Sequence, residues 1–263
     1  MNIGITQIIL GKMSLEETLD LCHEAGYESI ELVFSEDKDL NVEMNAAELA
    51  QVKSRCQEAK VEIASVIAWY NERGNLLSRD RGQRELCCKS LARSLEIAGA
   101  LGVDAVLLHP GQRSAEGTYQ QAFNDLCSAL KEMAELAAQN KTAIGVENVW
   151  NKFMLSPMEA RSLVEAVDSD WVGIYLDTAN MMAYGHPEHW IRALGSAIKK
   201  VHFKDFNRRE HRFVHLMDGD TDWPTIMAEL RTIGYNSSLI HEVGGDHQVL
   251  VEMAERMRRI VAL

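Results

Sequence analysis

Eight short runs of β-branched and other apolar residues alternate with eight longer amphipathic runs along the whole chain of 263 residues. The short runs predict strands over Asn2–Gln7, Glu28–Val33, Glu62–Trp69, Ala105–His109, Thr142–Asn148, Val172–Asp177, Ile198–Lys204 and Ser238–Val243. The amphipathic runs predict helices over Ser14–Ala25, Ala46–Ala59, Arg81–Leu101, Tyr119–Asn140, Ser156–Val167, Pro187–Leu194, Trp223–Ile233 and Gln248–Val261. Strict alternation of this kind favours a parallel sheet whose strands are joined by helical crossovers.

Residues typical of helix ends support these boundaries. Ser14 and Glu17 form a capping-box pattern ahead of the first helix. Gly26, Gly102 and Gly234 each follow a helical run, as helix-terminating glycines do. The mean unit is 263 residues divided by eight, or about 33 residues, which is the length of one βα repeat.

Eight βα units can close into a barrel or form a large open sheet. An open nucleotide-binding sheet favours a glycine-rich turn after its first strand, and the segment Ile5-Thr6-Gln7-Ile8-Ile9 contains no glycine. The length matches barrels of about 250 residues, and only 4 prolines and no Gly/Ser-rich linker interrupt the chain. We therefore predict an α/β fold, a (β/α)8 TIM barrel, as a single domain over residues 1–263.

Charge and cysteine content argue against several classes of partner. The net charge of −12 disfavours nucleic acid, which is bound mainly through Lys and Arg, and it disfavours acidic membrane surfaces. No apolar run approaches the roughly 18 residues of a membrane span, and the first residues predict no signal peptide. The 5 cysteines form no CxxC pair, and their odd number suits reduced thiols, so we expect a cytoplasmic protein.

Four consecutive predicted strands end in residues that can bind a metal ion. Active sites of (β/α)8 barrels lie at the carboxyl ends of the strands. The residues there are Glu147, Asp177, His202 and Glu242. Buried carboxylates need partners, and three carboxylates with one imidazole suit Mn²⁺, Mg²⁺ or Co²⁺, with Zn²⁺ left open.

These strand ends resemble those of the xylose-isomerase-like TIM barrels. The segments are Val146-Glu147-Asn148, Leu176-Asp177-Thr178-Ala179-Asn180, Val201-His202-Phe203-Lys204-Asp205 and Glu242-Val243. Over essentially the whole chain they are most similar to the sugar-phosphate isomerase/epimerase group, which includes ketose 3-epimerases and pentulose-phosphate 3-epimerases. The resemblance implies that the four residues share one divalent ion, often Mn²⁺, and that Glu147 and Glu242 are the catalytic acid/base pair.

The chemistry that this resemblance implies is proton transfer next to a ketose carbonyl. Such a step requires a stabilised enediolate, and a divalent ion provides that stabilisation as a Lewis acid. Two carboxylates on opposite faces of the sugar then invert the centre, whereas use of one face gives aldose–ketose isomerisation. We expect a small sugar or sugar phosphate as partner, and the resemblance implies a tendency to form homo-oligomers.

Two candidate substrate contacts follow from the resemblance. Family epimerases place an arginine six positions after the metal histidine, and here Arg208 stands six positions after His202. Free-ketose 3-epimerases usually have histidine three positions after the metal aspartate, where this chain has Asn180. This departure makes the chain more similar to the pentulose-phosphate branch and leaves the contacts to the sugar hydroxyls open.

Four further candidate substrate contacts lie at or just after predicted strand ends, namely Trp69, His109, Asn151 and Lys204. A structural role stays open for His109, and Lys204 is equally suited to bind an oxyanion or to balance Asp177. We expect Glu31 to end the second strand, as a site contact or as an ion pair at the barrel mouth. The basic segment 208–212 is a phosphate site, an exposed loop or an oligomer contact.

Other activities use similar centres. Inosose dehydration and hydroxypyruvate isomerisation need a comparable proton abstraction and are the main alternatives. An AP-endonuclease-like nuclease normally requires more metal ligands and a basic surface, which the charge of −12 disfavours. A non-catalytic sugar-binding barrel is disfavoured because both candidate acid/base glutamates are retained.

Overall fold

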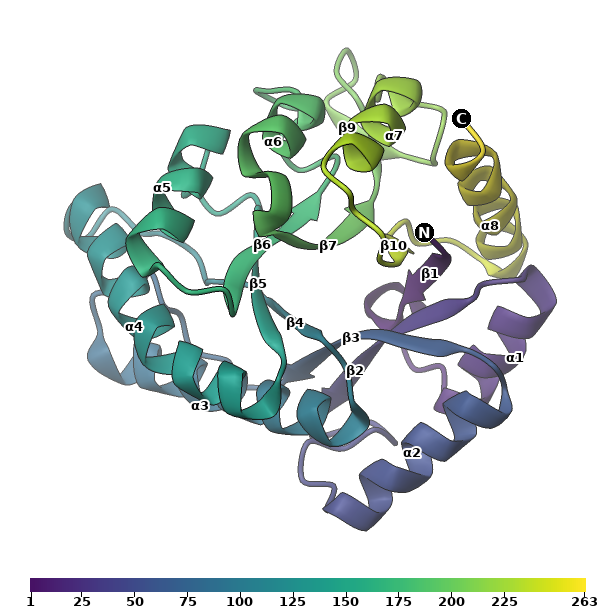
Figure 1. Cartoon of the computed structure of the whole chain (residues 1–263), viewed down its shortest axis with the longest axis horizontal. Helices are drawn as coiled ribbons and strands as arrows, with labels where there is room; N and C mark the ends of the chain where they lie inside the picture. The colour runs from purple at the N-terminus through teal and green to yellow at the C-terminus, as the bar shows by residue number, and fades with distance from the viewer.

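The computed structural model describes all 263 residues and confirms the predicted closed barrel (Figure 1). Its strands are β1 (Ile3–Thr6), β2 (Ser29–Ser35), β3 (Glu62–Trp69), β4 (Ala105–Leu108), β5 (Ala143–Glu147), β6 (Val172–Asp177), β7 (Ile198–Phe203) and β10 (Leu239–His241). Each strand pairs in parallel with the next barrel strand along the chain, and β10 pairs with β1 to close the ring.

Eight helices surround the barrel, one after each barrel strand (Figure 1). They are α1 (Leu15–Ala25), α2 (Ala46–Glu58), α3 (Arg81–Leu101), α4 (Tyr119–Asn140), α5 (Pro157–Val167), α6 (Pro187–Leu194), α7 (Trp223–Thr232) and α8 (His247–Val261). The predicted capping box of Ser14 and Glu17 is present, and Gly26 and Gly102 end α1 and α3 in the left-handed conformation. None of these helices is both long and apolar enough to cross a membrane.

A two-stranded antiparallel hairpin, which the sequence did not predict, follows β7. It consists of β8 (Asp205–Asn207) and β9 (Arg212–Val214). The buried carboxylate of Asp205 fixes the segment after the hairpin, because it accepts hydrogen bonds from Met217 N at 2.9 Å and from Thr221 Oγ1 at 2.6 Å. The basic segment 208–212 thus forms the turn of this hairpin and the first residue of β9.

Side chains alternate between the barrel interior and the surrounding helices, as they must along a strand. The inward cluster comprises Val33, Ala64, Ile67, Leu107, Tyr175 and Ile240. Two residues further along four of these strands lie Trp69, His109, Asp177 and Glu242. By the same alternation, these four side chains face the mouth of the barrel at its carboxyl end.

Two glycines allow β5, β6 and β7 to pack closely. Gly145 and Gly173 are paired in register. A Cβ atom on Gly145 would lie 3.0 Å from Tyr175 Cβ, and a Cβ on Gly173 would lie 2.2 Å from the carbonyl oxygen of Ala197. The second contact is with backbone, which has no side-chain rotation to relieve it.

We expect Gly173→Ala to lower the free energy of unfolding by about 1–3 kcal/mol, because the added methyl group would force the backbone apart. Urea unfolding followed by circular dichroism measures this change. Gly244→Ala is the matched control, since nothing lies within 4 Å of a Cβ at that position. An unchanged unfolding midpoint for Gly173→Ala would contradict the packing described here.

Candidate metal centre

Four side chains from neighbouring strands meet at the carboxyl end of the barrel. Glu147 ends β5, Asp177 ends β6, His202 lies on β7 and Glu242 directly follows β10. One ligand atom from each residue lies within 4.8 Å of the ligand atoms of the other three. The first three residues are buried and Glu242 is nearly so. The structure therefore brings together the four residues predicted to bind a metal.

The polar atoms at the centre of this cluster fit a divalent cation. Asp177 Oδ2, His202 Nδ1 and Glu242 Oε2 are buried and have no hydrogen-bond partner. His202 Nδ1 nevertheless lies 3.1 Å from Glu242 Oε2, and Lys204 Nζ lies 3.4 Å from Asp177 Oδ2. A buried polar atom without a partner is costly. A cation among these atoms would satisfy all three and would balance the carboxylate charges.

The second oxygen of Asp177 is held by the turn that follows β6. Asp177 Oδ1 accepts hydrogen bonds from the backbone amides of Ala179 and Asn180 at 2.8 and 2.7 Å. The side chain of Asn180 donates to the carbonyl oxygen of Asn148 at 2.9 Å, and Asn180 is buried. These bonds turn Asp177 Oδ2 toward the centre. They also engage both the backbone N–H and a side-chain N–H of Asn180 within the protein.

Glu31 holds the histidine from inside the barrel. It is fully buried, and its Oε1 atom lies 3.0 Å from His202 Nε2 and 2.6 Å from Thr6 Oγ1. The hydroxyl groups of Ser65 and Tyr175 donate to its other oxygen. Because a carboxylate only accepts, the Nε2 proton of His202 points to Glu31 and Nδ1 faces the centre, where it would offer its lone pair to a cation after releasing its own proton.

This position corrects the sequence-based placement of Glu31. It is the third residue of the seven-residue strand β2 and lies in the barrel interior, not at the strand end. The misplacement has two causes. Inward and outward side chains are both buried along β2, so the sequence pattern does not mark the strand end, and the strand continues to Ser35. Glu31 therefore acts on the centre through His202.

Protons, Lys204 and a metal cation compete for the carboxylates of this cluster. Burial, aided by the carboxylate of Glu242, raises the pKa of Glu147 to about 7. Although burial opposes it, the neighbouring His202 and Lys204 lower the pKa of Glu242 to about 2. Despite burial, Glu31 and Glu242 raise the pKa of His202 well above its usual value. Protons and Lys204 thus balance the same carboxylates that a cation would.

Lys204 lies at the rim of the centre. Its Nζ atom is 3.2 Å from Glu242 Oε2 as well as 3.4 Å from Asp177 Oδ2, and it lies 4.6 Å from the ring centroid of Phe213 on β9. Its carboxylate neighbours raise its pKa despite burial, so the ammonium group stays charged. Of the two roles considered for Lys204, this geometry supports charge balance with Asp177.

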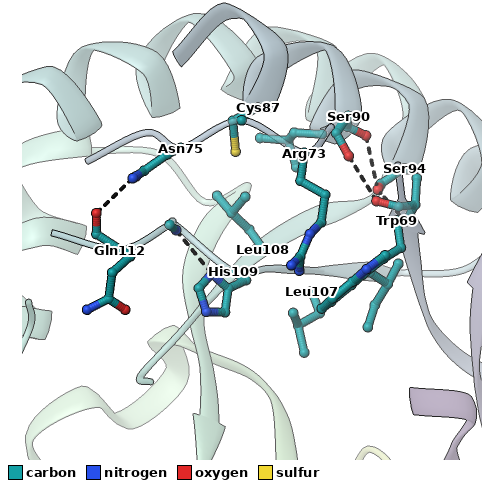
Figure 2. A pocket seen from close by; sticks show the side chains of 15 residues that line it. Trp69, Arg73, Asn75, Cys87, Ser90, Ser94, Leu107, Leu108, His109 and Gln112 are labelled. Carbon is teal, nitrogen blue, oxygen red and sulfur yellow. Dashed lines mark hydrogen bonds between the residues drawn. The ribbon is translucent and has the colours of Figure 1, made fainter. Parts of the chain in front are cut away.

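Trp69 and His109 line a neighbouring cavity of about 230 Å³ at the carboxyl ends of β3 and β4 (Figure 2). His109 Nδ1 accepts a hydrogen bond from the backbone amide of Gly111 at 3.1 Å. Burial, and then the charge of Arg73, lower the pKa of His109, so its ring is neutral at neutral pH. The neutral ring therefore carries its proton on Nε2.

Asn151 and Arg208, both predicted to contact substrate, are engaged with backbone. Asn151 is buried, and its Nδ2 atom donates to the carbonyl oxygen of Gly111 at 2.9 Å. Arg208 donates through its two terminal nitrogens to the carbonyl oxygens of Met182 and Gly185, at 2.6 and 2.7 Å. Asn151 thus joins the loops after β4 and β5, and Arg208 joins the hairpin to the loop after β6.

Sequence reasoning did not identify three residues that shape the site. Ser65 and Tyr175 lie in the middle of strands, where nothing in the sequence separates them from ordinary core positions. Arg73 lies in the loop after β3. Its one signal was a lone arginine near a predicted strand end of an acidic chain.

The fold and the cluster define a class: a (β/α)8 barrel with a candidate metal centre, three carboxylates and one imidazole, at the carboxyl end of its strands. Comparison of the sequence with known families places the chain more specifically. It belongs to the xylose isomerase-like TIM barrel family, whose sequence model matches residues 19–260. The predicted family resemblance is confirmed.

Individual proteins give the same assignment of fold. The chain is 26% identical over 255 residues to the putative L-ribulose-5-phosphate 3-epimerase SgbU of Escherichia coli, covering 92% of this chain and 88% of that protein. The crystal structure of a D-tagatose 3-epimerase-like protein matches with a TM-score of 0.84 at 21% identity, covering 100% and 97% of the two chains. The IOLI protein with a bound zinc atom matches with a TM-score of 0.84 at 18% identity, covering 100% and 98%.

We expect the affinity for Mn²⁺ or Zn²⁺ to rise between about pH 6 and about pH 8. With a pKa of about 7, Glu147 is mostly protonated at the lower pH and must release a proton on binding, whereas at the higher pH it is already ionised. Titration calorimetry of chelator-treated protein in two buffers of different ionisation enthalpy measures the affinity and the protons released. Equal affinity across this range would contradict the competition between proton and cation.

We expect Glu31→Gln to weaken metal binding by about 10- to 100-fold, because the ring of His202 loses the carboxylate that fixes its proton and orientation. Equilibrium dialysis with metal analysis measures the loss. Glu62→Gln is the matched control, since Glu62 begins β3 at the opposite, amino end of the barrel. Wild-type affinity in Glu31→Gln would show that His202 needs no such support.

Proposed function

We propose that the protein is an isomerase-class enzyme, a divalent-metal-dependent epimerase or isomerase of a small sugar or sugar phosphate. The observation that most supports this proposal is that Glu147 and Glu242 lie in one cluster with Asp177 and His202. The two glutamates come from β5 and from the end of β10, with β6 and β7 between them in the ring. They therefore approach the cluster from two sides, as an acid/base pair acting on two faces of a sugar requires.

The residues that would hold the ion are Glu147, Asp177, His202 and Glu242. Mn²⁺ is the ion we propose first for this oxygen-rich set with one nitrogen, and Mg²⁺, Co²⁺ or Zn²⁺ are the alternatives. The similarly folded IOLI protein is described with a bound zinc atom, which supports a divalent ion as the cofactor of this fold. When bound, such an ion would polarise the sugar carbonyl as a Lewis acid.

The chain's own groups would move the proton. One of Glu147 and Glu242 removes the proton next to the carbonyl, and the other returns one to the opposite face, which inverts the centre. Return to the neighbouring carbon on the same face would instead give an aldose–ketose isomerisation. Lys204, charged and 3.2 Å from Glu242, would balance the ionised carboxylate during these steps.

The relatives and the thiols support a small-molecule partner and a cytoplasmic location. The Escherichia coli relative is named as a putative pentulose-phosphate epimerase, which is why we place sugar phosphates within the substrate class. All five cysteines are free, in agreement with a reducing compartment. The expected homo-oligomer stays a prediction.

The test is proton NMR in D₂O of ketoses and ketose phosphates incubated with the Mn²⁺-loaded enzyme. We expect solvent deuterium next to the carbonyl and an inverted or isomerised product, both lost on chelation. Glu147→Gln and Glu242→Gln should each slow exchange by about 10²- to 10⁴-fold, because each removes one proton-transfer group. Glu165→Gln, on the exposed face of α5, is the control. No exchange with metal verified as bound would reject this function and favour inosose dehydration.

A further inference from the structure

The cavity beside the metal centre contains an arginine whose N–H groups have no acceptor in the protein. Arg73, in the loop after β3, lies over the ring of Trp69, with its Cζ atom 3.6 Å from the ring centroid (Figure 2). Its guanidinium makes no hydrogen bond and no ion pair, and no carboxylate contributes to its charge environment. Stacking uses only the face of the guanidinium, so the N–H groups along its edge remain free to bind a ligand.

The charge of the cavity is positive and uncompensated. Arg73 is the one charged residue among those lining it, and none of them is acidic. The volume of about 230 Å³ is several times the roughly 30 Å³ share of one water molecule, so a tetrahedral anion fits. A guanidinium fork binds two oxygens of a phosphate at once, which a lysine ammonium does not.

The loop that carries Arg73 is fixed to the loop after β4. Asn75 Nδ2 donates to the carbonyl oxygen of Gln112 at 2.7 Å, and the amide of Leu76 donates to the carbonyl oxygen of Pro110 at 3.0 Å. Gly111 has φ +100, and a Cβ atom there would lie 2.0 Å from Asn75 Oδ1. Only glycine permits this close approach, so the two loops form one wall that positions Arg73 in advance.

The cavity borders the metal centre. Leu108 of β4 is paired in register with Val146 of β5, so the residues that follow them, His109 and Glu147, are neighbours at the barrel mouth. Adjacent strands lie about 4.8 Å apart. The Nε2 proton of His109 adds a neutral donor to a cavity that Arg73 also lines. A substrate could therefore have its carbonyl end at Glu147 and a charged end at Arg73.

Two arginines of the hairpin near the mouth use their donors within the protein. Arg208 binds the carbonyl oxygens of Met182 and Gly185, and Arg212 pairs with Glu210 at 2.5 Å. Arg209 is the arginine of segment 208–212 that stays exposed without such a contact. It is the competing candidate that an experiment must test.

We propose that Arg73, stacked on Trp69 and assisted by His109, forms a subsite for the phosphate of a phosphorylated sugar whose carbonyl end lies at the metal centre. This inference rests on the proposed function and narrows its substrate class from sugars in general to sugar phosphates. Arg73 is then the residue that separates phosphorylated from free ketoses.

Binding of inorganic phosphate to chelator-treated protein tests the subsite without turnover and without metal. We expect calorimetric titration to show phosphate binding that Arg73→Ala weakens by about 10- to 100-fold, the effect of losing a charged hydrogen-bond donor. Arg73→Lys should be intermediate, because it keeps the charge and loses the fork. Arg81→Ala is the control, since that side chain is 83% exposed. Unchanged phosphate affinity in Arg73→Ala overturns the proposal.

Turnover of matched substrates forms the second arm. We expect Arg73→Ala to lower kcat/KM for a ketose phosphate by about 10- to 100-fold and to leave the free ketose nearly unchanged. If Arg209→Ala removes the preference instead, the phosphate lies at the hairpin and the proposal is overturned. Phosphate binding that depends on Arg73 in a protein without ketose turnover would support the subsite and reject the proposed function. Turnover without preference for phosphorylated ketoses would support the proposed function and overturn the phosphate subsite.

Discussion

The hydrogen bond between Glu31 and His202 is the interaction on which the candidate centre depends. Glu31 is fully buried, and donors from four other strands satisfy it: Thr6 on β1, Ser65 on β3, Tyr175 on β6 and His202 on β7. A buried carboxylate that lost one of these donors would bear a desolvation cost. The network therefore holds the barrel strands in register below the mouth and, at the same time, fixes which nitrogen of His202 faces outward.

In the layer above, at the mouth of the barrel, buried polar atoms lack hydrogen-bond partners. Three buried atoms of Asp177, His202 and Glu242 have no hydrogen-bond partner, and burial raises the pKa of Glu147 to about 7. Natural proteins accept such local costs mainly at functional sites, where the arrangement serves a ligand. The barrel thus carries a layer with complete hydrogen bonds directly beneath a layer whose carboxylates have ion-pair neighbours but incomplete hydrogen bonds. This contrast argues for a cation more strongly than the proximity of acidic residues alone.

The parts of this molecule that the sequence predicted are those that repeat or stand at strand ends. Alternation gave the eight βα units, and position after an apolar run gave the four metal-binding candidates, because the carboxyl ends of parallel strands meet. Glu31 was misplaced because a strand buried on both faces hides which residue is central. The hairpin β8–β9 was missed because its strands have three residues each. The stacking of Arg73 on Trp69 and the hydrogen bonds of Arg208 depend on loop geometry that no local pattern encodes.

Different strands of the barrel form the candidate metal centre and the arginine cavity. The metal-binding candidates come from β5, β6, β7 and β10, whereas the arginine cavity is built from the ends of β3 and β4 and their loops. Descendants of one ancestral gene could thus exchange the segment from Trp69 to Gln112 and accept a different molecule while keeping their reaction. Such divergence would pass through no intermediate that had lost its metal ligands, which makes a barrel of this layout a favourable starting point for new substrate preferences.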